Sequence, residues 1–278
     1  MTTVVPLGLA EQTEIRAYAD FVTGAPAPLR ERLGIGSLDL GPVRAITVRE
    51  DPSRFFNRAG GFDVDRPADA EAVDALVEFF RTQRVPSGAF MIAPSVLPPD
   101  WAAIAEKFGL TEGARFVKLG CAVEAAAAKV ESLAPLDPLL RVGLVEQEHA
   151  REWAVAMMTT FGFIEPGMDE IAEACVGRPG WRQYAVWEAE RIVAVGSIFV
   201  NGDCADMFGG ATVAGWRRRG AQSALLAARV LAAQAAGCRW MVAEAVPEAP
   251  GEHNPSLHNM LGIGFERMYE RVAWNWHA

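Results

Sequence analysis

The segment that decides the fold is Ala211-Thr212-Val213-Ala214-Gly215-Trp216-Arg217-Arg218-Arg219-Gly220-Ala221-Gln222-Ser223-Ala224-Leu225-Leu226. It joins the end of an apolar strand, a basic turn and the start of an alanine-rich helix. Such a turn presents unpaired backbone N–H groups at a helix N-terminus, where the helix dipole also favours anions. Gly220 lets a ligand approach the backbone, and the arginines add positive charge. The segment therefore predicts a site for a pyrophosphate group.

The sequence after residue 135 predicts a mixture of strands and helices around this segment. Turn signals at 188–191 and 201–203 indicate that three consecutive strands form an antiparallel meander. The helix after the basic turn is expected to bury Ala221, Ala224, Leu225, Ala228, Leu231, Ala232 and Ala235. The expected strands span 140–145, 181–188, 191–200, 204–213, 239–246 and 265–276, and the expected helices 149–161, 168–175, 219–236 and 254–260.

The first half of the chain also alternates helix and strand. Helices are expected at 11–23 and 68–84, and strands at 43–49, 89–93 and 115–123. An alanine-rich stretch runs into Pro135 and Pro138, which predicts two domains, 1–134 and 135–278. Residues 101–110 and 254–265 both have the pattern of a helix that ends at a glycine and is followed by a strand. This similarity indicates either a duplicated domain or a chance recurrence of the pattern.

Composition narrows the class of protein. The 278 residues carry a net charge of −9, which weighs against nucleic acid and suits a cationic substrate such as an amine. No apolar run reaches the ~18 residues of a membrane span, and no secretory signal is visible, so we expect a cytoplasmic protein without membrane contact. The cysteines form no C-x-x-C pair, and His253 and His258 are too loosely related to carboxylates for a metal centre. We therefore expect no metal.

Arg217-Arg218-Arg219-Gly220-Ala221-Gln222 resembles the signature [Q/R]-x-x-G-x-[G/A] of the GNAT superfamily of acetyl-CoA-dependent N-acetyltransferases. Gln222 departs from the last position. Residues 58–61 and 234–237 fit the shorter R/Q-x-x-G pattern too, but only Arg217–Gly220 lies between a strand and a helix. Downstream, Asn254-Pro255-Ser256 and Gly264-Phe265 are similar to the family's last helix and the Gly-Phe pair that follows it.

This resemblance implies an α/β (α+β) fold with a mixed, mostly antiparallel sheet flanked by helices. It also implies two tandem GNAT-like domains, the first degenerate or accessory. The implied activity is direct transfer of an acetyl group from acetyl-CoA to a primary amine of a small molecule or protein. The cosubstrate would lie between splayed strands 204–213 and 239–246, where the Gly209-Gly210 pair allows a bulge and the Gly210 N–H polarises the acetyl carbonyl. The implied cofactor-binding residues are Thr212, Val213, Arg217, Arg218, Arg219, Gly220, Ala221, Gln222, Ser223, Asn254 and Ser256.

The proton-transfer groups remain open at this point. Asp206 or Glu244 could act as the base, or either could be an ordinary strand carboxylate or ion-pair partner. The family's tyrosine acid aligns with Met260, and Tyr269 is at the wrong offset. Either water or His258 protonates the thiolate, or the chain is a non-catalytic acyl-CoA-binding or protein-interaction module with this fold. Gly220→Asp is expected to abolish CoA binding and leave the fold intact.

Overall fold

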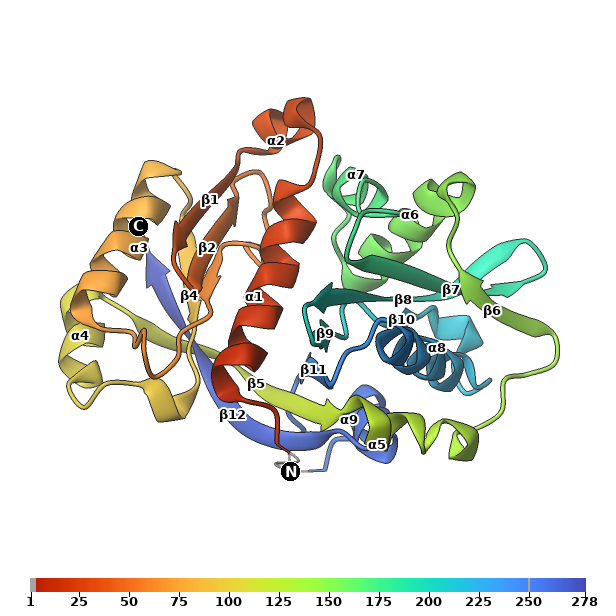
Figure 1. Cartoon of the computed structure of the whole chain (residues 1–278). Coiled ribbons are helices and arrows are strands. Elements are labelled where there is room, and N and C mark those ends of the chain that lie inside the picture. The colour runs from red at the N-terminus through yellow and green to blue at the C-terminus, as the bar shows by residue number, and fades with distance from the viewer. Residues whose placement is uncertain (1–3, 250) are drawn as a thin grey trace. The chain divides into compact units, whose positions relative to one another are not determined.

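The computed structural model describes residues 4–249 and 251–278 (Figure 1). The backbone contacts divide the chain into two compact units. The first unit contains Pro6–Lys118, Ala245–Pro247 and Arg267–Ala278. The second unit contains Val4 and Val5 and the described residues of Leu119–Glu244 and Glu248–Glu266. The C-terminal strand is therefore part of the unit that the first half of the chain builds.

The first unit is a mixed sheet with helices on both faces. Its strands follow the order β1-β2-β3-β4-β12-β5, in which β3 and β4 are parallel, and the neighbours β1–β2, β2–β3 and β4–β12 are antiparallel. The elements are α1 (Leu7–Thr23), α2 (Ala27–Leu33), β1 (Ile35–Leu40), β2 (Val43–Val48), β3 (Arg58–Gly60), α3 (Ala70–Thr82), β4 (Ser87–Met91), a 3₁₀ turn (Pro94–Val96), α4 (Trp101–Phe108), β5 (Thr111–Ala122) and β12 (Glu266–His277).

One face of this sheet carries α1, and the other carries the core beneath α3 and α4 (Figure 1). α3 begins at an Asp69 N-cap, whose carboxylate accepts a hydrogen bond from the Ala72 N–H at 2.9 Å. The Phe80 ring stacks on Trp276 of β12, with 6.0 Å between the ring centroids. Tertiary contacts of this kind attach the last strand of the chain to the first unit.

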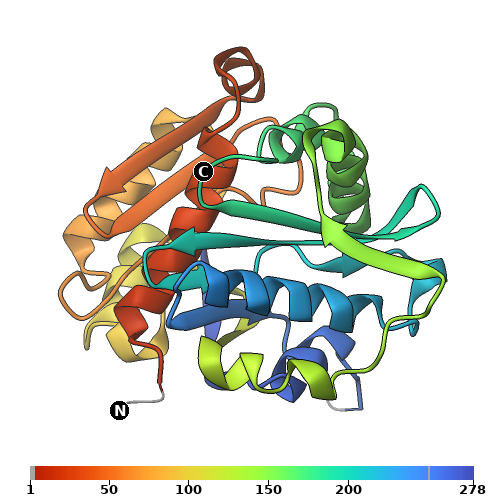
Figure 2. The same cartoon turned by 45° about the vertical axis from the view of Figure 1, so that its right-hand side comes forward.

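The second unit is a strongly twisted sheet between two helical layers, of which α8 lies along one face (Figure 2). Its strands follow the order β11-β9-β8-β7-β6, with β10 also paired to β8. The elements are α5 (Val123–Ala127), a 3₁₀ turn (Val130–Ser132), β6 (Leu140–Leu144), a 3₁₀ turn (Gln147–His149), α6 (Ala150–Phe161), α7 (Met168–Glu173), β7 (Trp181–Glu188), β8 (Arg191–Asn201), β9 (Cys204–Asp206), β10 (Ala211–Thr212), a 3₁₀ turn (Ala214–Trp216), α8 (Ala221–Ala235), β11 (Trp240–Ala245) and α9 (Pro255–Gly262).

The meander expected from the two turn signals is confirmed, because β7–β8 and β8–β9 are both antiparallel pairs. The expected strand 204–213, however, is wrong as one element. It breaks into β9 and β10, and Gly209 between them has a φ of +59°. A glycine adopts this left-handed backbone without the steric cost that a side chain would add.

The expected buried face of α8 is also partly wrong. Leu231 is 47% exposed, whereas Leu226 and Val230 are fully buried. The buried residues are Ala221, Leu225, Leu226, Arg229, Val230 and Ala233. In an alanine-rich helix, more than one stripe of residues at helical spacing is apolar. The stripe that contains Leu225, Leu226 and Val230 faces the sheet, because these larger side chains bury more apolar area than alanines do.

Three elements of the first unit have no counterpart in the sequence-based prediction: α2, β1 and β3. β3 has only three residues and α2 only seven, so both are shorter than the windows over which apolar periodicity identifies a strand or a helix. The other expected elements are present within a few residues. The domain boundary at residue 134/135 stays a prediction. The chain passes from the first compact unit to the second at Leu119, and it returns to the first unit at Arg267.

Candidate functional site

The strands β9 and β11 part from one another in the middle of the second unit. They pair in parallel from Cys204 opposite Trp240 to Asp206 opposite Val242. The Met207 N–H donates the next bond to the Val242 carbonyl at 2.9 Å. The chain then turns toward β8, where the Ser197 N–H donates to the Phe208 carbonyl and β10 pairs with β8. Within the described residues, β10 is paired with β8 alone, and no strand pairing joins β10 to the last residues of β11.

Gly209 and Gly210 lie where the strands part. Within the described residues, the N–H of neither glycine donates to a backbone carbonyl. A Cβ at Gly209 would lie 2.4 Å from the Met157 Cε, and one at Gly210 would lie 3.1 Å from the Arg229 Nη2. Both positions thus favour glycine, and the Gly210 N–H is free to bind a carbonyl or oxyanion.

The loop after β10 presents a row of backbone donors. The first intrahelical bond of α8 runs from the Ala224 N–H to the Gly220 carbonyl at 3.0 Å, and no side chain caps the helix. Arg218 and Gly220 both have positive φ, +62° and +78°. Within the described residues, none of the N–H groups from Arg217 to Gly220 donates to a backbone carbonyl, so they are available to an anion. The early N–H groups of α8 add to this set.

The three arginines of the loop have different surroundings. Arg219 donates to the Asp137 Oδ2 at 2.8 Å and to the Glu188 Oε1 at 2.7 Å, and the Asp137 N–H donates to the Arg219 carbonyl. The hydrogen bond from Arg219 lowers the pKa of Asp137. Glu188 also accepts from the Trp216 Nε1 at 2.7 Å. Arg219 therefore fixes the loop to β7 instead of offering its charge to a ligand.

Arg217 and Arg218 are exposed, and within the described residues they have no ion-pair partner. Their charges are thus available beside the row of N–H groups. Thr212 and Val213 precede them, and the Val213 N–H donates to the Val193 carbonyl at 3.0 Å. Ala221 is buried, whereas Gln222 and Ser223 are half-buried in the first turn of α8.

The expectation that Gly220→Asp leaves the fold intact is contradicted by the packing of Gly220. A Cβ at this position would lie 2.1 Å from the Pro135 carbonyl oxygen, and the φ of +78° is strained for any side chain. A substitution here must displace the 135–136 backbone. Loss of binding in Gly220→Asp would therefore report disruption of the loop as well as repulsion of phosphate.

Asp206 lies in a buried electrostatic environment. Its side chain is on β9 with 5% of the residue exposed, and it raises the pKa of Arg229, although burial lowers that pKa overall to about 10. Arg229 is 1% exposed, and its Nε donates to the Leu225 carbonyl at 3.0 Å. The arrangement gives Asp206 a charge-balancing partner inside the sheet–α8 core.

Glu244 lies farther along β11, two residues past the point where the strands part. Because side chains alternate along a strand, Glu244 is on the same face of β11 as Val242, the residue opposite Asp206. The structure therefore places both candidate bases on one face of neighbouring strands. Glu244 is half-buried, whereas Asp206 is buried.

The residues expected near the end of the site belong to α9. The Asn254 Oδ1 accepts from the N–H groups of Ser256 and Leu257 at 3.0 and 3.3 Å, so Asn254 caps the helix. Ser256 is half-buried, and Met260, at the position of the family's tyrosine, is 7% exposed. Tyr269 is in the first unit, where its hydroxyl hydrogen-bonds to Glu11 and burial raises its pKa.

The histidines at the start of α9 are close to a carboxylate. The His258 Nε2 is 2.8 Å from the Glu248 Oε1, and the His253 Nδ1 is 3.6 Å from the same oxygen. The sequence-based reason for expecting no metal was that these histidines are too loosely related to carboxylates, and that reason is wrong. Glu248 lies between β11 and α9, five residues before His253 and ten before His258, which is not the spacing of a common zinc motif.

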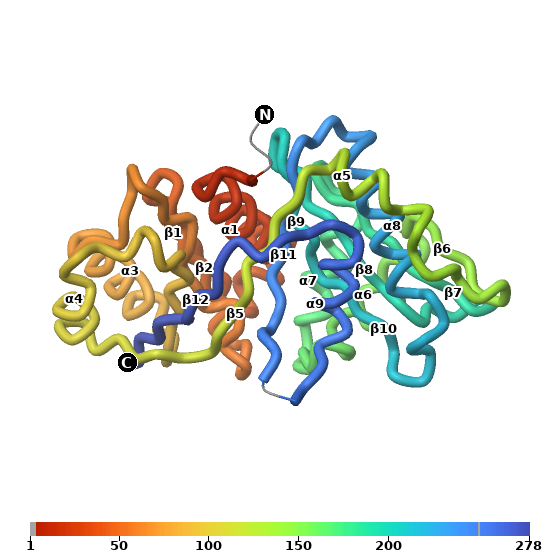
Figure 3. The backbone as a smooth tube through the Cα atoms, turned by 90° about the horizontal axis from the view of Figure 1, so that it is seen from below, coloured from red at the N-terminus to blue at the C-terminus, as the bar shows by residue number. Residues whose placement is uncertain are grey.

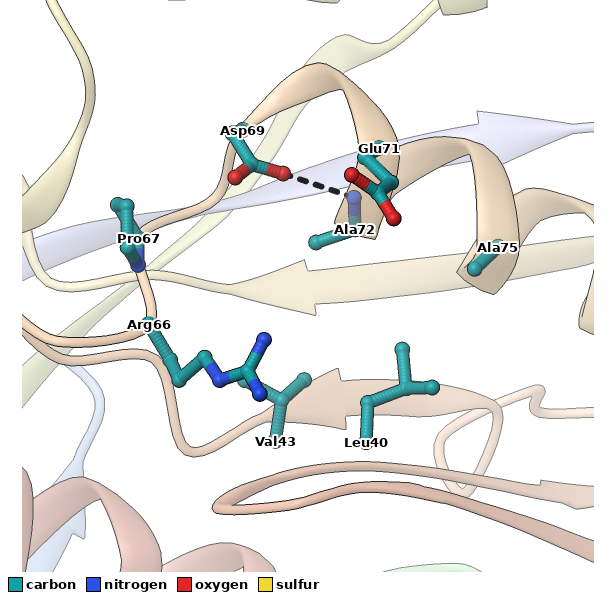
Figure 4. A pocket seen from close by; sticks show the side chains of 8 residues that line it. All are labelled: Leu40, Val43, Arg66, Pro67, Asp69, Glu71, Ala72 and Ala75. Atoms are coloured by element: carbon teal, nitrogen blue, oxygen red, sulfur yellow. Dashed lines mark hydrogen bonds between the residues drawn. The ribbon is translucent and has the colours of Figure 1, made fainter.

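The first unit has a small hollow of about 160 Å³ between β1, β2 and the start of α3 (Figure 4). Asp69, which lines it, already caps α3 through the Ala72 N–H. The hollow contains none of the residues expected to bind a cofactor. Its lining residues are Leu40, Val43, Arg66, Pro67, Asp69, Glu71, Ala72 and Ala75.

Comparison with solved structures identifies the architecture. A tandem GNAT protein from the clavulanic acid biosynthesis pathway matches with a TM-score of 0.61 and 12% identity over 96% of this chain and 96% of that chain. The chain has the GNAT fold. A GCN5-related N-acetyltransferase from Kribbella flavida matches this GNAT-fold chain with a TM-score of 0.58 and 16% identity over 98% and 96% of the two chains. One from Sphaerobacter thermophilus gives a TM-score of 0.56, 14% identity, and coverage of 99% and 95%.

No protein-family model matches the sequence, and a comparison with curated proteins gives no match. The GNAT-fold likeness therefore rests on structure, and at such low identity it shows the fold and not the reaction. The expected mixed, mostly antiparallel sheet with flanking helices is confirmed. In the described part of the chain, no helix is both long and apolar enough to cross a membrane.

Proposed function

We propose that the chain is an acetyl-CoA-dependent N-acetyltransferase that moves the acetyl group directly to a primary amine of a small molecule or protein. The observation that carries this proposal is the end of the β9–β11 pairing at Asp206 and Val242, followed by Gly210, whose N–H donates to no backbone carbonyl within the described residues. Pantetheine would bond to the exposed edge of β10 as an added strand does. The Gly210 N–H would polarise the thioester carbonyl and stabilise the tetrahedral oxyanion.

The loop before α8 would bind the pyrophosphate. The N–H groups from Arg218 to Ser223 supply donors, and the exposed Arg217 and Arg218 supply charge. In this scheme Arg219 and Gly220 position the loop, Gln222 and Ser223 lie beside the phosphates, and Asn254 and Ser256 form the start of the neighbouring helix. Acetyl-CoA is thus a cosubstrate of the second unit.

We propose Glu244 as the base that takes a proton from the attacking amine. Asp206 is the less suitable candidate because it balances the buried charge of Arg229. The thiolate of CoA takes its proton from solvent, since Met260 has none to give and Tyr269 is engaged by Glu11. We further propose that 1–134 is a degenerate GNAT-like copy and that the protein is cytoplasmic.

Calorimetric titration with acetyl-CoA tests the cosubstrate site. Arg217→Ala and Arg218→Gly should each weaken binding about tenfold, because each removes a charge-assisted contact worth ~1.5 kcal/mol. Arg30→Ala is the matched control, since Arg30 is an exposed arginine of α2 in the first unit. If the folded wild type binds no acetyl-CoA, the assignment is wrong.

Catalysis needs a separate measurement, the release of free thiol with a panel of primary amines. Glu244→Gln should lower kcat by ~10²-fold or more and leave acetyl-CoA affinity unchanged, because a base acts only in the chemical step. Tight binding without thiol release from any amine would instead support a non-catalytic acyl-CoA-binding module. That alternative is motivated by Met260 at the position of the family's acid.

A further inference from the structure

Two imidazoles and one carboxylate come together where β11 is followed by α9: Glu248 and His253 lie between the two elements, and His258 lies on α9. Figure 3 shows the backbone of β11 and α9. The ligand atoms of Glu248, His253 and His258 all lie within 4.8 Å of one another. The two imidazole rings have centroids only 4.3 Å apart and are tilted by 40°. The nitrogen atoms of both rings therefore lie on the same side of the loop as the Glu248 carboxylate, within reach of one ion.

These distances fit a tetrahedral transition-metal site. Zinc bonds of ~2.0–2.2 Å to nitrogen and oxygen place neighbouring ligand atoms ~3.4 Å apart. The Glu248 Oε1 is 2.8 Å from the His258 Nε2 and 3.6 Å from the His253 Nδ1. Small rotations of exposed side chains would bring all three atoms around one ion. The ring proton of each histidine would then sit on its other nitrogen.

The backbone holds these groups in place. The Asn254 N–H donates to the Glu248 Oε1 at 2.7 Å, which fixes the carboxylate beside the helix start. The His258 N–H donates to the Asn254 carbonyl at 3.1 Å in the first turn of α9. The same turn at the start of α9 therefore orients the Glu248 carboxylate and the His258 imidazole. Because these side chains are already ordered, less conformational entropy is lost when a metal ion binds.

We propose that Glu248, His253 and His258 bind a divalent transition-metal ion, with Zn²⁺ as the reference ion. Two imidazoles and one carboxylate suit Zn²⁺, Co²⁺ or Ni²⁺ and do not suit Mg²⁺ or Ca²⁺, which prefer oxygen ligands. The fourth position is open to water, because both histidines are at least half exposed. The ion would cross-link the loop after β11 to α9, and it would prevent His258 from acting as a proton donor.

Titration of the metal-free full chain with ZnCl₂ in competition with a chromophoric chelator tests this site. The wild type should bind one equivalent of Zn²⁺ at micromolar concentration or below. His253→Ala, His258→Ala and Glu248→Gln should each weaken binding by tenfold or more, since each removes one of three ligands. An excess of Mg²⁺ or Ca²⁺ should not displace Zn²⁺.

His149→Ala is the matched control. His149 also lies beside carboxylates, 3.6 Å from Glu148 and 4.0 Å from Glu152, but without a second imidazole. The four cysteines are buried, so they do not compete for the ion. Circular dichroism checks that each variant folds. Absence of Zn²⁺ binding by the wild type, or equal loss in His149→Ala and His258→Ala, would overturn the proposal, whatever the outcome of the acetyl-transfer assays.

Discussion

At the scale of single residues, backbone conformation determines what the basic loop can tolerate. Gly220 has a φ of +78° and packs on the Pro135 carbonyl, whereas Gly215 has open space around its Cα. Arg218 holds a φ of +62° even though it has a side chain. Non-glycine residues with positive φ are uncommon and concentrate at functional sites, so Arg218 stands out within the loop.

Gly220→Ala should lower the free energy of unfolding by ~2 kcal/mol or more, because left-handed backbone alone costs an alanine ~1–2 kcal/mol and the contact with Pro135 adds to it. Gly215→Ala should change stability by less than ~0.5 kcal/mol. Urea unfolding of the two variants measures the difference. Equal stabilities would contradict the packing described for Gly220.

Arg218→Gly separates binding from folding. Replacing a strained arginine by glycine should leave the free energy of unfolding unchanged or raise it by up to ~1 kcal/mol, since the strain is relieved. The same variant should bind acetyl-CoA about tenfold more weakly because it lacks the charge. Thermal unfolding measures the stability of this variant, and calorimetry on the same preparation measures its affinity for acetyl-CoA. A loss of stability together with the loss of affinity would show that Arg218 has a structural role.

Asp206 and Arg229 form a pair whose members should be tested together. Asp206→Asn should lower stability by ~3–5 kcal/mol, because it leaves the buried Arg229 uncompensated. Adding Arg229→Met should restore much of that loss, since the double variant buries no unpaired charge. Chemical denaturation of the two single variants and the double variant measures the coupling. A stable but inactive Asp206→Asn would instead identify Asp206 as the base.

At the scale of elements, a buried ionic cluster fastens α1 to β12 and β5 in the first unit. Arg271 donates to Glu11 at 2.7 and 2.8 Å, and it also contacts Glu14, which in turn pairs with Lys118. All four side chains are nearly inaccessible. Buried charges are tolerated only when they are paired, so this cluster specifies how α1 lies on the sheet.

This buried cluster predicts that the stability of the protein falls at low pH. Burial raises the pKa of Glu14, but Arg271 and Lys118 outweigh it and lower the pKa to about 2. A carboxyl group whose pKa is lower in the folded than in the unfolded protein stabilises the fold at pH values above its unfolded pKa of 4.5. This stabilisation is lost as the pH falls toward 2. The stability difference between wild type and Glu14→Gln, measured by urea unfolding, should therefore be larger at pH 6 than at pH 3.

Glu78→Gln is the control for this experiment, because Glu78 is an exposed helix residue 3.8 Å from Arg81. The free energy of unfolding of Glu78→Gln should equal that of the wild type at both pH values, since exposed ion pairs contribute little to stability. A Glu14→Gln variant with the same pH profile as Glu78→Gln would show that the buried cluster does not couple to protonation.

At the scale of the whole molecule, the last strand of the chain belongs to the unit that Pro6–Lys118 forms. Residues of β12 from Ala273 to His277 pair with β4, and Trp274 lies edge-on to Trp101. A chain cut at the expected boundary would separate this strand from its unit. Residues 1–134 alone would then lack the strand beside β4 and Arg271, which pairs with the buried Glu11 and Glu14.

The isolated fragment 1–134 should consequently fail to fold cooperatively, and it should gain structure when a peptide of residues 265–278 is added. The physical reason is that without β12 the β4 edge is exposed, the Trp276 site is empty, and the buried Glu11 carboxylate loses Arg271, while Glu14 keeps only Lys118. Circular dichroism and thermal unfolding measure the outcome. Cooperative unfolding of 1–134 alone would support the sequence-based boundary instead.

The sequence by itself determined the local features. Strand, basic turn and alanine-rich helix follow from short-range periodicity and turn residues, so the meander and the segment Arg217–Gly220 were predictable. Only the tertiary structure decided which arginine pairs with Asp137, which face of α8 is buried, and that Glu248 meets His253 and His258. The pairing of Arg219, the buried face of α8 and the membership of β12 in the first unit depend on contacts between residues far apart in the chain. The contact of Glu248 with the two histidines depends on how the chain turns between β11 and α9. Local periodicity carries no information on such contacts.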